Sequence, residues 1–210
     1  MSRFLVVFDV DSTLIEDEVI ELLAEAAGKR AEVKAITDSA MAGELDFAQS
    51  LTARVAMLAG VPASAIDETF KRVAVTKGAR ELIAGIHSAG GKVAAVSGGF
   101  IQVLEPLAKE LGIDFYRANT LEVVDGHLTG KTQGQIVDRS VKASSLLEWA
   151  EALGLTASQT IAVGDGANDL EMMSVAGLGV AFNAKPLVRA NADLVLSGES
   201  LESLLAILPN

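Results

Sequence analysis

The sequence predicts an α/β protein: a doubly wound, mostly parallel sheet with a small helical cap inserted after the first strand. From residue 78 onward, strand-like apolar runs alternate with helical stretches, as in parallel βαβ units. Residues 17–75 show helical spacing and no convincing strand, and this is more chain than a simple crossover needs. We therefore expect a core of residues 1–16 and 76–210, with residues 17–75 as a cap over the carboxyl edge of the sheet.

The first strand and the cap helices follow from the spacing of apolar residues. Arg3–Val7 is an apolar, β-branched run that predicts a strand buried on both faces. Asp46 followed by Gln49 is typical of a helix start with an acidic N-cap. Helical spacing predicts the cap helices at Asp17–Lys29, Ala31–Ala42, Asp46–Gly60 and Ala63–Val73.

The core elements alternate along the rest of the chain. Further strands are expected at Lys92–Val96, Asp114–Ala118, Thr160–Val163, Gly179–Phe182 and Leu194–Leu196. Helices are expected at Ala79–Ala89, Phe100–Leu111, Ser140–Leu153, Leu170–Ala176, Pro186–Ala190 and Ser200–Leu208. Asp125-Gly126, flanked by two short apolar runs, predicts a tight hairpin turn.

Composition excludes several kinds of partner. The net charge of −11 argues against nucleic acid and anionic membranes, whose phosphates require a basic face. The chain has no Cys, so disulfides and thiolate chemistry are absent. Because no apolar run reaches about 18 residues and no charged leader precedes one, we expect a cytoplasmic protein. We expect it to be a monomer or a homodimer.

The stretch at Phe8–Ile15 is the first candidate for chemistry. It places Asp9 and Asp11 where the first strand ends, and ligands of open parallel sheets bind at the carboxyl ends of strands. Taken alone, this pair favours an acidic, solvated turn over a functional site. Asp165, at the end of a later strand, adds a third carboxylate if the first strand is central in the sheet.

Three carboxylates at one sheet edge require a counter-ion, because like charges raise each other's pKa. Oxygen ligands without His or Cys nearby indicate Mg²⁺, whose coordination shell is usually completed by waters and a substrate phosphate. The alternative is three unrelated acidic loop residues. Their shared position at strand ends favours the metal.

Other residues suit a phosphate group. Ser97 and the free amides of Gly98 and Gly99 are suited to cradle an anion, although the same residues also suit a simple turn. Lys142, near the start of its helix, would neutralise a phosphoryl group, or it is a solvated surface charge. Asn168 would donate at the site, and the adjacent Asp would hold a metal-bound water; both also suit helix caps.

Taken in order, these motifs resemble those of the haloacid dehalogenase superfamily. They are Asp9-x-Asp11-Ser12-Thr13, Ser97-Gly98-Gly99, Lys142 and Gly164-Asp165-Gly166-x-Asn168-Asp169. Within that superfamily, further residues resemble the phosphoserine phosphatases, and the likeness covers nearly the whole chain. They are Glu18, Met41, Phe47, Arg54, Phe100, Ala118-Asn119-x-Leu121-Glu122 and Asp125-Gly126-x-Leu128-Thr129-Gly130. The chain departs at Val10, where an aromatic is frequent, and at Ile101, where Thr is frequent. With Asp9 so near the start, we expect no regulatory domain ahead of it.

The resemblance implies roles for the motif residues. Asp9 would be the nucleophile that forms an aspartyl-phosphate, and Asp11 the general acid and then base. Mg²⁺ would be held by Asp9, by the main-chain carbonyl of Asp11 and by Asp165. The phosphate contacts would fall on Ser97, Gly98, Lys142 and Asn168.

The resemblance also implies the substrate. Glu18 would bind the ammonium of O-phospho-L-serine and Arg54 its carboxylate, although both also suit a helix surface. Met41 and Phe47 would pack around the substrate or only within the cap. The implied reaction is Mg²⁺-dependent hydrolysis to L-serine and phosphate, the last step of serine biosynthesis. The alternatives are a related phosphatase of another small phosphometabolite, a phosphotransferase with an acceptor such as homoserine, and a receiver-type signalling domain.

Overall fold

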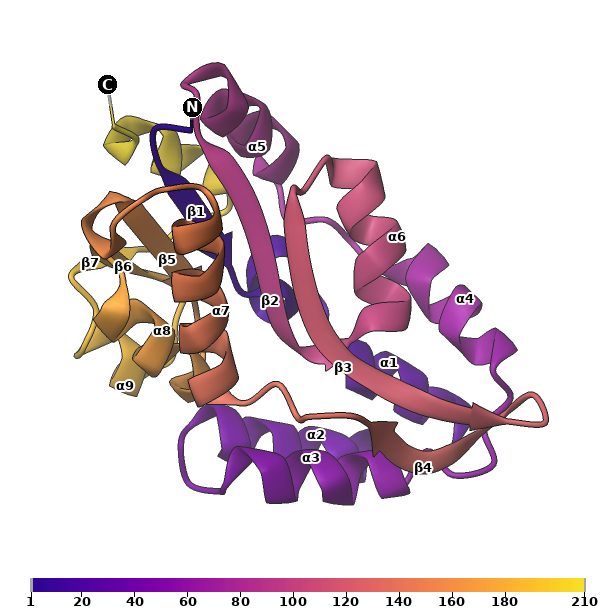
Figure 1. Ribbon diagram of the computed structural model, residues 1–210. Helices are drawn as coiled ribbons and strands as arrows, with labels where there is room; N and C mark the ends of the chain where they lie inside the picture. The colour runs from indigo at the N-terminus through magenta and orange to yellow at the C-terminus, as the bar shows by residue number, and fades with distance from the viewer. Residues whose placement is uncertain (1, 210) are drawn as a thin grey trace.

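The computed structural model describes residues 2–209 and contains a seven-stranded sheet in the order β4-β3-β2-β1-β5-β6-β7 (Figure 1). All neighbouring strands are parallel except β3 and β4, which form an antiparallel hairpin. The strands are β1 Leu5–Phe8, β2 Lys92–Phe100, β3 Phe115–Val124, β4 His127–Gln133, β5 Thr160–Gly164, β6 Leu178–Phe182 and β7 Leu194–Leu196. The predicted doubly wound α/β fold is confirmed, with β1 at the centre of the sheet.

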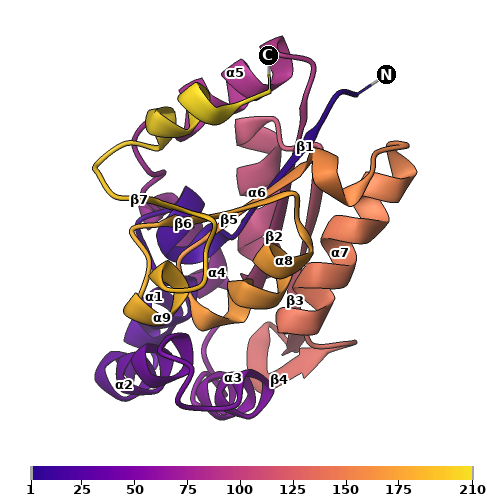
Figure 2. The same ribbon diagram turned by 90° about the vertical axis from the view of Figure 1, so that its left-hand side faces the viewer.

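Helices cover both faces of this sheet (Figure 2). Because side chains alternate along a strand, Val6 and Phe8 of β1 enter one core and Leu5 and Val7 the other. On the first face lie α5 Ala79–Ser88, α6 Ile101–Leu111 and the 3₁₀ segment η4 Leu201–Ile207. On the second lie α7 Arg139–Ala152, α8 Leu170–Val175 and α9 Pro186–Arg189. Short turns at η1 Val10–Leu14, η2 Ala157–Gln159 and η3 Ala167–Asp169 complete the elements.

Four helices stand between β1 and α5: α1 Val19–Ala26, α2 Arg30–Met41, α3 Phe47–Ala56 and α4 Ser64–Arg72. As the pattern predicted, the Asp46 carboxylate caps α3 by accepting the amide of Gln49 at 2.9 Å. The chain enters and leaves this helical insertion side by side. Glu16 N–H donates to the Ala74 carbonyl and Thr76 N–H to that of Leu14, both at 2.9 Å.

The tip of the β3–β4 hairpin is joined to the insertion. Asp125 and Gly126 both have positive φ, 49° and 75°, as the predicted tight turn between twisted strands requires. From the turn, the Gly126 carbonyl accepts the amide of Ala63, and Leu128 exchanges hydrogen bonds with Gly60 and Val61. The β3–β4 hairpin therefore joins the sheet to the helical insertion through backbone hydrogen bonds.

Several elements differ from the sequence prediction. The third strand, expected at Asp114–Ala118, spans Phe115–Val124. The second strand does not stop at Val96 but continues to Phe100, because the backbone at Gly98-Gly99 shifts register and then pairs again, Phe100 opposite Asn119. Glycines without side chains allow such an irregularity within a strand. The segment at Leu201–Ile207 is a 3₁₀ helix, whereas an ordinary helix was expected. Among residues 2–209, no helix is long and apolar enough to cross a membrane.

Candidate active site

The register of the three central strands brings the predicted motifs together. Phe8 of β1 lies opposite Ala95 of β2 and Val163 of β5. Asp9 therefore follows at the same edge as Ser97 and Asp165, and its amide donates to the Val163 carbonyl at 2.8 Å. The next turn, η1, contains Ser12 at a φ of +60°, a left-handed conformation that non-glycine residues seldom adopt. Asp9, Ser97 and Asp165 thus share the carboxyl edge of the sheet around β1.

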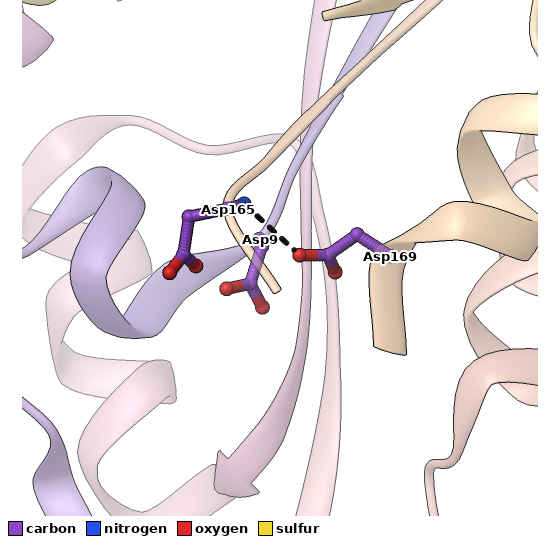
Figure 3. A group of neighbouring side chains, drawn as sticks. All are labelled: Asp9, Asp165 and Asp169. Carbon is purple, nitrogen blue, oxygen red and sulfur yellow. Dashed lines mark hydrogen bonds between the residues drawn. The ribbon is translucent and has the colours of Figure 1, made fainter. Parts of the chain in front are cut away.

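Three buried carboxylates meet at this edge: Asp9, Asp165 and Asp169 each place an oxygen within 4.8 Å of the others (Figure 3). Burial, reinforced by the charge of Asp169, raises the pKa of Asp9 to about 7. Burial and the two neighbouring carboxylates also raise the pKa of Asp165 well above its ordinary value. Carboxylate oxygens grouped in this way are hard donors that suit a divalent cation such as Mg²⁺.

A buried cation, Lys142 at the fourth position of α7, lies beside these carboxylates. Its ammonium forms ion pairs with the carboxylates of Asp9 and of Asp169, the latter at 2.7 Å, and these two charges hold the pKa of Lys142 above its ordinary value. The other oxygen of Asp169 accepts the amide of Asp165 at 3.1 Å (Figure 3) and that of Gly166 at 3.0 Å. Asp169 thus fixes both Lys142 and the loop that carries Asp165.

The carboxylate of Asp11 is separate from that acidic group. Asp11 is half-buried, its buried Oδ1 has no hydrogen-bond partner, and its Oδ2 would lie 3.1 Å from a Cβ placed on Gly99. Burial, together with the charges of Glu18 and Asp9, raises its pKa well above the ordinary range. Asp11 is therefore suited to hold a proton that it can donate.

The segment Ser97–Gly99, which was expected to bind phosphate, lines the same cavity as Asp9 and differs from the expectation in one hydrogen bond. The sequence suggested a free amide at Gly99, but this amide donates to the Ser97 hydroxyl at 2.8 Å. The loop is held from β3 by Asn119, whose amide donates to the Gly98 carbonyl and whose carbonyl oxygen accepts the amide of Val137, both at 2.8 Å. Val137 precedes α7, so Asn119 connects the loop to the helix that carries Lys142.

A cavity between core and insertion contains most of these groups. It is lined by Asp9, Asp11, Glu18, Ile20, Met41, Phe47, Leu51, Arg54, Ser97, Gly98, Gly99 and Asn168. The Phe47 ring from α3 lies so close to Gly98 that a Cβ there would be 2.3 Å away, so a glycine is required where the insertion closes on the loop.

The two charged residues from the insertion both reach this cavity. Glu18 accepts the Ser12 hydroxyl at 2.8 Å, and burial raises its pKa. Arg54 is 2% exposed, so its helix-surface alternative is wrong. Its Nη2 has no hydrogen-bond partner. Asn168 also leaves a buried oxygen without a partner.

Of the residues predicted for the site, all but Asp165 and Lys142 line the cavity. Asp165 lies within 4.8 Å of Asp9, measured between carboxylate oxygens, and Lys142 forms an ion pair with Asp9. Sequence reasoning missed three supporting residues: Asp169 as the ion-pair partner of Lys142, Asn119 as the clamp on the loop, and Thr37 as a partner of Arg54. Asp169 carried a signal, because it stands in the same motif as Asp165. Nothing in the local pattern around Thr37 distinguishes it from other helical threonines.

Comparison with known proteins identifies similar chains. A phosphoserine phosphatase of Streptomyces coelicolor is 56% identical over 204 residues, 97% of this chain, but this chain spans only 50% of that relative's length. A phosphoserine phosphatase of Streptococcus thermophilus is 52% identical over 97% of this chain and 95% of its own. A solved structure described as a phospho-aspartyl intermediate analogue of phosphoserine phosphatase superposes with a TM-score of 0.97 at 40% identity, covering 100% of both chains.

The sequence pattern of the haloacid dehalogenase-like hydrolases matches residues 6–174. This range begins in β1 and ends in α8, so it contains the Asp9 turn, the Ser97–Gly99 loop, Lys142 and the Asp165 loop. The chain therefore belongs to the family of haloacid dehalogenase-like hydrolases.

Proposed function

We propose that this protein is a Mg²⁺-dependent phosphatase that hydrolyses O-phospho-L-serine to L-serine and phosphate. One observation carries the proposal: a single small cavity holds Asp9 and Asp11 together with an anion and a cation, Glu18 and Arg54, from the insertion. Phosphoserine carries a phosphate, an ammonium and a carboxylate. These would face the Asp9–Asp11 pair, Glu18 and Arg54, respectively. The names of the relatives at 56% and 52% identity support the same substrate.

In the proposed reaction, an Asp9 oxygen attacks phosphorus and the bond from phosphorus to the serine oxygen breaks. Asp11 donates its proton to the departing serine oxygen. Asp11 then accepts a proton from a water that attacks the aspartyl-phosphate, so the bond to Asp9 breaks and phosphate forms. The raised pKa of Asp11 suits the first of these proton transfers. Lys142, paired with Asp9, favours the ionised, nucleophilic form of that carboxylate.

Other residues of the core would bind the phosphate. The Ser97 hydroxyl, the Gly98 amide and Asn168 border the same cavity, and together with Lys142 they would stabilise charge on the phosphoryl oxygens. A bound Mg²⁺ would be held by Asp9, the main-chain carbonyl of Asp11 and Asp165. When bound, it supplies positive charge to the phosphoryl group and favours the ionised forms of these carboxylates.

We further propose that residues 17–75 act as a cap domain that reads the amino acid and excludes water from the chemistry. The paired strand-like connections at Glu16 and Thr76 support these boundaries. Glu18 would bind the substrate ammonium and Arg54 its carboxylate. Met41 and Phe47, which also line the cavity, would pack around the substrate's short side chain.

The test is phosphate release from a panel of phosphomonoesters, with and without competing acceptor alcohols such as homoserine. The panel pairs O-phosphoserine with O-phosphoethanolamine, which lacks only the carboxylate, and adds phosphothreonine, sugar phosphates and an aryl phosphate. We expect many turnovers and the highest kcat/KM for phosphoserine. Equal rates across the panel would contradict the substrate, transfer to the alcohol would indicate a phosphotransferase, and a single turnover would indicate a receiver-type domain.

Removal of divalent metal should abolish turnover, because the acidic group at Asp9 then lacks its counter-ion. We expect phosphate release to fall to background in excess chelator and to return when Mg²⁺ is restored. Since an ion that binds only the folded state raises stability, Mg²⁺ should also raise the melting temperature. In Asp165→Asn that rise should be lost, whereas Asp193→Asn, far along the chain near β7, should retain it. Full activity in chelator would contradict the metal assignment.

Arg54→Ala should impair phosphoserine hydrolysis selectively. Loss of a buried charge that meets a substrate carboxylate costs on the order of 10²-fold or more in kcat/KM. O-phosphoethanolamine has no carboxylate, so its hydrolysis should fall much less. The measurement is the ratio of the two kcat/KM values. Equal losses on both substrates would remove Arg54 from substrate recognition.

A further inference from the structure

Glu18 and Arg54 have opposite charges and line one cavity, yet in the described chain they do not form an ion pair with each other. Each is held instead by a neutral hydroxyl. The Ser12 hydroxyl donates to Glu18 at 2.8 Å, and Arg54 Nη1 donates to the Thr37 hydroxyl at 3.0 Å. A direct pair would neutralise both groups, so their separation needs a structural cause.

Arg54 is anchored at two of its three nitrogens. Its Nε–H donates to the Ser50 carbonyl of the same helix at 3.2 Å, and Nη1 donates to Thr37 of the neighbouring helix α2. Nη2 has no partner although it is buried. The single hydrogen of Nε is already used. The donors left for an incoming anion are the two hydrogens of Nη2 and the second hydrogen of Nη1.

Thr37 can only accept from Arg54, and this fixes the direction of the contact. Its hydroxyl hydrogen is used by the Val33 carbonyl, to which it donates at 3.0 Å within α2. The side chain is 1% exposed, so water cannot replace it. The Arg54 guanidinium also lies over the Phe47 ring, 5.9 Å from its centre, but this contact offers it no hydrogen-bond acceptor.

We infer that Thr37 is a specificity-determining positioning residue: its hydroxyl holds the Arg54 guanidinium away from Glu18 and turned toward the substrate carboxylate. The inference rests on the proposed function, since it concerns recognition of the amino acid. It assigns Thr37 no contact with substrate. Without the hydroxyl, Arg54 is free to turn to the Glu18 carboxylate, and a zwitterionic substrate then has to break that pair before it binds.

The test compares Thr37→Val, which keeps the shape and removes the acceptor, with Thr37→Ser, which keeps the acceptor. Thr52→Val on α3 is the matched control. The exposed Thr52 hydroxyl makes the same bond to a carbonyl four residues earlier, that of Ala48 at 2.8 Å, so its replacement costs the same local bond without touching Arg54. Melting temperatures of all variants separate a loss of folding from a change in recognition.

The kinetic readout is the kcat/KM of O-phosphoserine divided by that of O-phosphoethanolamine. In Thr37→Val we expect this ratio to fall roughly tenfold, mostly through a higher KM for phosphoserine, as loss of one hydrogen bond to a charged group predicts. Thr37→Ser and Thr52→Val should keep the wild-type ratio. An unchanged ratio in Thr37→Val would overturn the inference, whereas a wild type that does not prefer phosphoserine would overturn the proposed function itself.

A second readout needs no substrate. The ¹H–¹⁵N signal of the Arg54 Nε–H is identified by its absence in Arg54→Lys. We expect Thr37→Val to shift it and to speed its exchange with water, because the guanidinium loses an anchor, while Thr37→Ser and Thr52→Val leave it in place. An unmoved signal in Thr37→Val shows that Thr37 does not position Arg54, whichever substrate the protein prefers.

Discussion

Replacing Asp9 by Asn should abolish phosphate release while leaving the protein folded. The amide is a poor nucleophile, so kcat should fall by at least about 10⁴-fold, as for other enzymes that lose a nucleophile. The fold, by contrast, does not depend on the charge of Asp9. Burial and Asp169 already raise its pKa to about 7, so a neutral group of the same shape is tolerated there, and Lys142 keeps its pair with Asp169.

The measurement is single-turnover and steady-state phosphate release beside thermal unfolding. Asp67→Asn is the matched control, because Asp67 is exposed in the first turn of α4 and has no part in the site. We expect full activity in this control and a melting temperature close to wild type in both variants. Turnover at the normal rate in Asp9→Asn would exclude the aspartyl-phosphate intermediate.

Replacing Lys142 by Met should damage both stability and activity. Lys142 is 0% exposed and is paired with two carboxylates. Met fills a similar length without the charge, which leaves Asp9 and Asp169 buried and uncompensated. Removal of one partner from a buried ion pair typically lowers the free energy of unfolding by about 3–5 kcal/mol. Loss of the positive charge beside the phosphoryl group should also lower kcat by roughly 10²–10³-fold.

Urea unfolding and steady-state kinetics measure these two effects. Lys109→Met is the control, because Lys109 also pairs with a carboxylate, Glu105 at 2.8 Å, but on the exposed surface of α6. Exposed pairs contribute little to stability, so this variant should unfold at the same urea concentration as the wild type. If Lys142→Met unfolded at the wild-type urea concentration, the buried pairs would not be a source of stability.

Much of the fold and of the candidate site could be predicted from the sequence because both follow from local patterns. Apolar runs that end in polar residues located β1, β2 and β5, and the rule that ligands bind at the carboxyl ends of parallel strands brought their ends together. The hairpin at Asp125-Gly126 and the N-cap at Asp46 were equally local. These predictions needed no knowledge of packing between distant segments.

The remainder depends on contacts between segments far apart in the chain. The glycines after Val96 were expected to end β2, but pairing with β3 continues the strand to Phe100. Thr37 and Arg54 are 17 residues apart, and Asn119 and Gly98 are 21 apart. Only the packing of α2 on α3, and of β3 beside β2, gives these polar side chains their partners. Their roles in holding the site are therefore visible only in three dimensions.

Rapid quenching of the wild-type protein with O-phosphoserine and Mg²⁺ tests the central claim most directly. Acid quenching in the first turnovers, followed by digestion and mass spectrometry, locates any phosphoryl group on the chain. We predict that it is found on Asp9, that it forms at least as fast as phosphate is released, and that it is absent in Asp9→Asn. Phosphate release at the full rate with no phosphoryl group on Asp9, or with the group on another residue, would contradict the account.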